Sequence, residues 1–78
     1  MPEWTATRHA LARMRERGVP DEAVTRVLDA PMIQRPAGSR RGAPPADILI
    51  GLYEGRRLRV YVERNSSPPR VKSAAWED

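Results

Sequence analysis

Apolar residues at helical spacing predict two helices in the N-terminal part of the chain. The first helix is expected to end at Arg17, because Gly18 readily takes the left-handed conformation that stops a helix. Thr5 or Thr7 has a side chain suited to cap its start. A second helix is expected over residues 20–30, with one apolar face made of Ala23, Val24, Val27 and Leu28.

The rest of the chain has the composition of strands and turns. Residues 57–64 alternate between apolar and polar, which places on one face Leu58, Val60 and Val62. Three other segments have strand composition: Met32–Arg35, Asp47–Tyr53 and Arg70–Trp76. Residues 36–46 are rich in Gly, Ser, Arg and Pro, so they are expected to form an exposed loop.

This order of elements predicts an α+β domain. We expect two N-terminal helices packed on one face of an antiparallel meander of three or four strands, in the order ααβββ or ααββββ. The 78 residues form one domain, 1–78, without an internal repeat, and are close to the lower limit for a chain that folds alone.

Composition excludes several classes of site. The chain has no cysteine and one histidine, so disulfides, thiolate metal sites and multi-histidine zinc sites are excluded, and no cofactor is expected. The longest apolar stretch, Ile48–Ile50, is too short to span a membrane, and residues 1–10 lack the apolar core of a signal peptide. A cytoplasmic protein is therefore expected.

The chain is basic. Fourteen basic residues against ten acidic residues give a net charge of +4, and every basic residue except Lys72 is arginine. One interpretation is codon bias, because Ala, Pro, Arg and Gly are all abundant, as in a GC-rich genome. The other is phosphate binding, for which the planar guanidinium is suited. The positions of the arginines must decide between them.

The histidine belongs to a row of basic residues on the first helix. His9, Arg13 and Arg17 follow one another at intervals of four, so they lie on one side of the helix, next to its buried face. There a histidine is both held and accessible, which favours a role in proton transfer. The alternative is a partly buried histidine that bonds to a carbonyl or to Glu16.

The predicted strands supply further candidates. Arg59 and Tyr61 share the polar face of their strand, which Arg57 extends, although any two-layer α+β domain has a polar outer face. Arg64 stands at the end of that strand, and Ser73 alternates with apolar neighbours on the last strand. A histidine, several arginines and a hydroxyl are the groups that metal-free RNA cleavage needs.

Several segments resemble a small bacterial family of unknown function. The segment from His9 to Val19 resembles its HAxxRMxERG opening motif, and residues 55–60 resemble its GRxLxV strand. The layout is similar to the BrnT toxins and, more distantly, to RelE-like ribonucleases, which cut RNA without a metal and are neutralised by an antitoxin. The resemblance implies site roles for His9 and Arg13, with Arg59 or Arg64 contributing from the sheet.

The leading hypothesis is a metal-independent endoribonuclease toxin that acts on RNA, either free or on the ribosome. The residues expected in the chemistry are His9, Arg13, Arg59 and Ser73. The residues expected to bind RNA are Arg17, Arg57, Tyr61 and Arg64. Two alternatives remain: a non-catalytic module that binds nucleic acid or the ribosome, and a small interaction domain whose arginines match an acidic partner.

Overall fold

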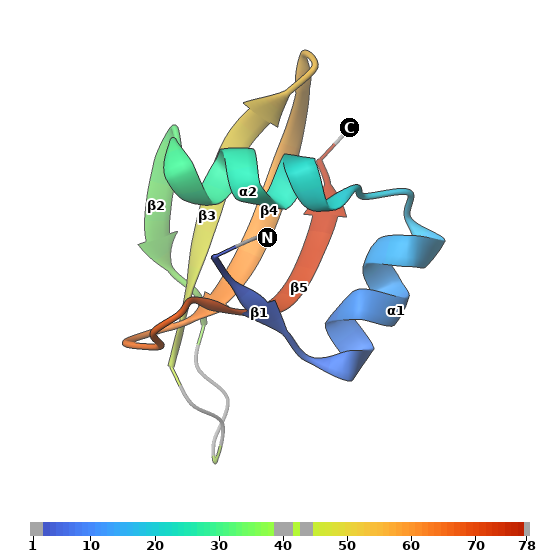
Figure 1. Cartoon of the computed structure of the whole chain (residues 1–78). Coiled ribbons are helices and arrows are strands. Elements are labelled where there is room, and N and C mark those ends of the chain that lie inside the picture. The colour runs from blue at the N-terminus through green and yellow to red at the C-terminus, as the bar shows by residue number, and fades with distance from the viewer. Residues whose placement is uncertain (1–2, 39–41, 43–44, 78) are drawn as a thin grey trace.

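The computed structural model of the chain describes residues 3–38, 42 and 45–77. Figure 1 shows two helices and a twisted sheet. The elements in chain order are β1 (Thr5–Ala6), α1 (Arg8–Glu16), α2 (Asp21–Asp29), β2 (Ile33–Pro36), β3 (Ala46–Tyr53), β4 (Arg56–Glu63) and β5 (Arg70–Trp76). Part of the predicted loop 36–46, namely residues 39–41 and 43–44, lies outside the described residues.

The sheet has five strands in the order β1-β5-β4-β3-β2. Strands β2 to β5 pair antiparallel, whereas β1 pairs parallel with β5 through Thr5↔Arg70 and Ala6↔Val71. The α+β class is confirmed, but the predicted ααβββ or ααββββ order and the purely antiparallel sheet are wrong. A two-residue strand has no periodicity to detect, and it forms here because the N–H of Thr5 donates to the carbonyl of Pro69 at 2.8 Å.

The helix ends follow the local signals in the sequence. Thr7 is the N-cap of α1, and its hydroxyl oxygen accepts a hydrogen bond from the N–H of Ala10 at 3.0 Å. Gly18 has a φ of 65°, which is the left-handed stop that the sequence predicted after α1. Pro20 directly precedes α2, and the first turn of that helix carries the acidic Asp21 and Glu22.

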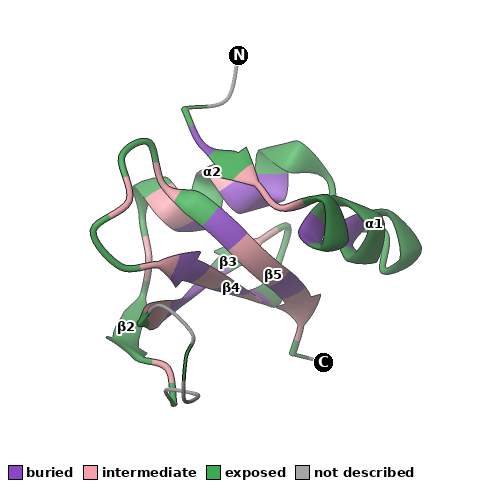
Figure 2. Cartoon of the chain, turned by 90° about the horizontal axis from the view of Figure 1, so that it is seen from below, coloured by how far each residue is buried: buried purple, intermediate pink, exposed green. Residues whose placement is uncertain are grey.

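The two helices take different places on the sheet. Helix α2 lies across one face and packs on β3 and β4 (Figure 1). Its residues Val24 and Val27 are fully buried against the sheet. Helix α1 instead packs beside β5, where Ala10 and Met14 are its buried residues (Figure 2). The prediction that both helices cover one sheet face is therefore wrong for α1, which among the described strands packs on β5 alone, although Ala10 and Met14 join the same core cluster as Val24 and Val27.

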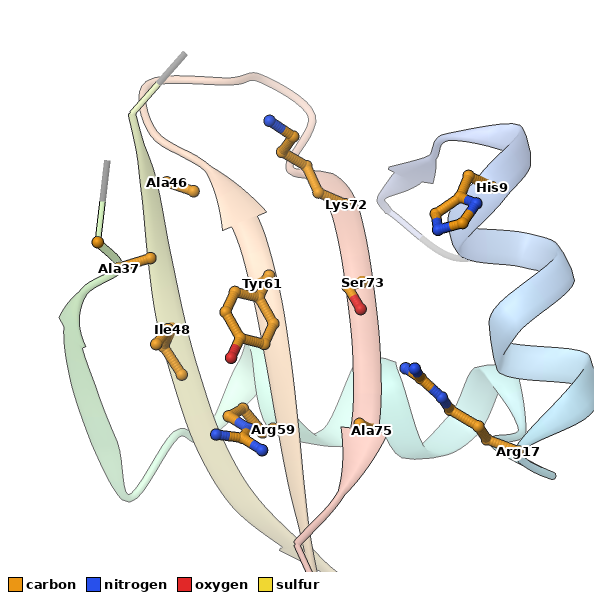
Figure 3. Close-up of a pocket in the computed structure, with 11 residues that line it drawn as sticks. His9, Arg17, Ala37, Ala46, Ile48, Arg59, Tyr61, Lys72, Ser73 and Ala75 are labelled. Carbon is orange, nitrogen blue, oxygen red and sulfur yellow. The ribbon is translucent and has the colours of Figure 1, made fainter. Parts of the chain in front are cut away.

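The placement of α1 leaves the second face of the sheet without a helix. Alternation on β4 buries Leu58, Val60 and Val62 on the α2 side, as predicted. Arg59 and Tyr61 therefore lie on the opposite face, which is the face drawn in Figure 3. Neither helix of the described residues is long and apolar enough to cross a membrane.

Candidate functional site

A groove of about 640 Å³ lies on the sheet face opposite α2 (Figure 3). Helix α1 borders it on one side, and the chain that follows β2 borders it on the other. The residues that line it are His9 and Arg17 from α1, Ala37 and Gly38 after β2, Ala46 and Ile48 from β3, Arg59 and Tyr61 from β4, and Lys72, Ser73 and Ala75 from β5. The floor of the groove is thus the sheet itself.

Helix α1 contributes two groups at different ends of the groove. His9 and Arg17 are separated by about 12 Å along the helix axis, at 1.5 Å per residue. The guanidinium of Arg17 donates through Nη1 to the carbonyl of Ala74 at 2.9 Å, and the indole N–H of Trp76 donates to the carbonyl of Arg17 at 3.0 Å. These two bonds fix Arg17 and the end of α1 against β5.

His9 is exposed, and its ring lies on the side of α1 that faces β5 (Figure 3). No hydrogen bond joins its imidazole to another described residue. Glu16, the alternative partner that the sequence suggested, is bonded to Arg13 at 3.3 Å instead. The imidazole is therefore accessible from the groove.

Strand β4 places Arg59 and Tyr61 side by side in the middle of the floor. The guanidinium carbon of Arg59 lies 5.8 Å from the centroid of the Tyr61 ring. The Nε atom of Arg59 is buried and has no hydrogen-bond partner among the described residues. A buried donor without a partner has a desolvation cost, whereas Arg59 as a whole is half-buried and lines the groove, so an anion there contacts the exposed part of its guanidinium and not Nε.

Strand β5 contributes two consecutive residues. Val71 pairs with Val62 and Ser73 pairs with Tyr61, so Lys72 is an extra residue in a β-bulge. Both Lys72 and Ser73 line the groove. Lys72 was not predicted as a site residue. Regular alternation would place it on the face opposite Ser73, and no feature of the local sequence indicates the bulge.

Three predicted site residues lie outside the groove and are engaged with carboxylates. Arg13 pairs with Glu16 on α1. The other two pairs are Arg57 with Glu77 at 3.4 Å and Arg64 with Asp47 at 2.9 Å. The structure thus brings together five of the predicted residues, which are His9, Arg17, Arg59, Tyr61 and Ser73.

The charge of the groove is positive. Arg17, Arg59 and Lys72 line it together with His9, and no carboxylate is among its described lining residues. In the part of the chain that the structure describes, no group of three His, Asp or Glu side chains is arranged to hold a metal ion. The arrangement is suited to bind an anion with an apolar or aromatic part, because Ile48, Ala75 and the Tyr61 ring lie among the cations.

Comparison with known proteins defines the family. No curated protein and no solved structure gives a significant match to the chain. The model of a domain of unknown function, DUF4258, matches residues 6–76. The match reaches from the end of β1 to the end of β5, so it includes both helices and every strand that lines the groove. The chain therefore belongs to the DUF4258 family of domains of unknown function.

Proposed function

We propose that the groove binds RNA and that the protein is a metal-independent endoribonuclease. The observation that carries the proposal is that the only histidine lines the same groove as Arg17, Arg59 and Lys72, with no carboxylate in the described lining. RNA supplies both the phosphates that such cations bind and the bases that stack on an aromatic ring such as Tyr61.

The groove holds the groups that cleavage by transesterification requires. The His9 imidazole accepts the proton of a 2′-hydroxyl, and the 2′-oxygen attacks the adjacent phosphorus. Arg59 stabilises the charge that develops on the phosphate oxygens. The bond to the 5′-oxygen then breaks, leaving a 2′,3′-cyclic phosphate, and a hydroxyl of Tyr61 or Ser73 donates a proton to the leaving oxygen. The proton held by His9 passes through solvent to that hydroxyl after the product leaves, which restores both groups.

The resemblance to BrnT and RelE-like toxins extends this proposal. An RNA-cleaving protein of this kind acts in the cytoplasm, arrests growth when it is expressed alone, and requires a neutralising partner protein. The positive groove is suited to an acidic segment of such a partner as well as to RNA. These properties rest on the ribonuclease proposal and share its test.

The test is cleavage of a fluorescent RNA by purified protein in the presence of EDTA. We expect wild type to release fragments with 2′,3′-cyclic phosphate ends, and His9→Ala to reduce the rate by roughly 10²-fold or more, as for the loss of a general base. Arg15→Ala is the matched control, because Arg15 is an exposed residue of the same helix outside the groove. RNA left intact by wild type, or cut equally by His9→Ala, would reject the nuclease.

A non-catalytic RNA-binding module is the second candidate. It is favoured by the absence of any described residue that orients the His9 ring, because a catalytic histidine is usually oriented by a third group. Such a module would bind RNA in a salt-dependent way and would not cleave it. His9→Ala would then change only the affinity for RNA. The EDTA assay separates the two candidates directly.

A further inference from the structure

The β-bulge in β5 adds one side chain, that of Lys72, to the lining of the groove. On β4, Val62 faces the core and Tyr61 faces the groove. Their partners on β5 are Val71, which is fully buried, and Ser73, which lines the groove. Lys72 is inserted between these two pairs, so the strand keeps its core residues and its groove residues in place and gains one extra side chain.

That extra side chain projects into the basic groove. In Figure 3 Lys72 extends from β5 over the sheet in the same half of the groove as His9, whereas Arg17 and Arg59 occupy the other half. Tyr61 and Ser73 lie between the two halves. The groove therefore has a cationic group in each half, and the bulge supplies the one in the half that holds His9.

Lys72 is also distinguished by its electrostatic surroundings. Three neighbouring arginines outside the groove have a carboxylate partner, in the pairs Arg57–Glu77, Arg64–Asp47 and Arg70–Glu63. No carboxylate of the described residues forms an ion pair with Lys72, although its side chain is half-buried. An ammonium that lines the groove without a carboxylate partner is available to bind an external anion.

We propose that Lys72 is a phosphate-binding residue of the RNA site, and that the bulge presents it in the half of the groove that holds His9. The inference rests on the proposed function and assigns a contact within it. Lys72 binds a backbone phosphate next to the scissile one, in the half of the groove that holds His9, while Arg59 contacts the scissile phosphate from the middle of the floor. Bulges often re-aim side chains next to functional sites in this way.

The test is RNA binding by fluorescence anisotropy over a range of NaCl concentrations. The probe is a single-stranded oligonucleotide with 2′-O-methyl riboses, which cannot be cleaved through a 2′-hydroxyl. Loss of one phosphate contact should weaken binding roughly tenfold at low salt and lower the slope of log K against log salt by about 0.7. We expect this result for Lys72→Gln, whereas Lys72→Arg should keep the wild-type slope.

The matched control is Arg26→Gln, which removes the same charge from α2 on the other side of the sheet. If Lys72→Gln and Arg26→Gln have equal slopes while wild type binds, the Lys72 contact is wrong and the proposed function stands. If wild type does not bind RNA at any salt concentration, both the proposed function and the Lys72 contact are wrong.

Deletion of Lys72 tests the bulge itself. Without this residue, Val71 and Ser73 can pair with Val62 and Tyr61 as a regular ladder, so the fold should persist in circular dichroism and thermal melting. We expect the deletion to lower affinity and salt slope as much as Lys72→Gln does. A folded deletion variant that binds like wild type would overturn the inference.

Discussion

At the scale of single residues, Arg59 lies on the groove face of β4 and carries a buried nitrogen that has no hydrogen-bond partner among the described residues. Its place on the open face follows from the alternation of residues 57–64, which is visible in the sequence. The buried and unpartnered state of its Nε atom is a tertiary property, since it depends on what the neighbouring strands place around it. Such an atom destabilises the free protein, because no hydrogen bond offsets its desolvation.

Replacement of Arg59 should therefore separate stability from binding. Arg59→Met keeps the aliphatic part of the side chain and removes the buried donor, so the free energy of unfolding should stay within about 1 kcal/mol of wild type or rise. Affinity for the 2′-O-methyl oligonucleotide should fall at least as far as in Lys72→Gln. Urea unfolding and anisotropy measure the two effects. Strong destabilisation with unchanged binding would assign Arg59 a purely structural role.

At the level of elements, the fold depends on the close approach of α2 to β3. Gly51 is buried at this contact, and a Cβ atom built on it would lie 3.2 Å from Cγ2 of Val27. A glycine inside a strand often marks such an approach. Because α2 holds β3 and β4 from the core side, this contact also supports the floor of the groove on the other side.

A larger residue at this position should overpack the core. We expect Gly51→Val to lower the free energy of unfolding by roughly 1–3 kcal/mol, because the added methyl groups meet the Val27 side chain. The second substitution Val27→Ala in the same chain should restore part of that loss, as expected for residues in contact. Urea unfolding of both single variants and the double variant measures the coupling. Strict additivity would mean that the two residues do not compete for space.

At the level of the whole molecule, a hydrogen bond between β3 and α2 makes the stability of the protein depend on pH. The hydroxyl of Tyr53 donates to a carboxylate oxygen of Glu22 at 3.2 Å. Partial burial, followed by this hydrogen bond and the charge of the carboxylate, raises the pKa of Tyr53 above its ordinary value of 10.0. The neutral phenol is therefore favoured in the folded protein.

The sign of the pH dependence follows from this shift. Because the pKa is higher in the folded state, the stabilisation is fully present below pH 10 and is lost as the pH rises through the folded value. Tyr53→Phe should show a smaller loss of stability as the pH rises above about 10, the ordinary pKa of a phenol. Urea unfolding at each pH, with Glu22→Gln as the companion variant, measures the difference. Equal alkaline losses in wild type and Tyr53→Phe would contradict the coupling.

Local signals in the sequence determined the helix ends and the faces of the longest strands. Thr7 and Gly18 act within a turn of their own positions, and the two-residue period of β4 is a property of the strand alone. For the same reason the groove face of Arg59 and Tyr61 was predictable. The expectation of a family of unknown function agrees with the match over residues 6–76.

Only the tertiary structure decided how these pieces meet. The parallel strand β1, the bulge at Lys72 and the position of α1 beside β5 all depend on hydrogen bonds and packing between distant segments. Such contacts produce no periodic pattern of apolar residues in the sequence, because each depends on two segments that are distant in the chain. They also place His9 at the border of the groove, add a lysine to it, and leave Arg13 outside it.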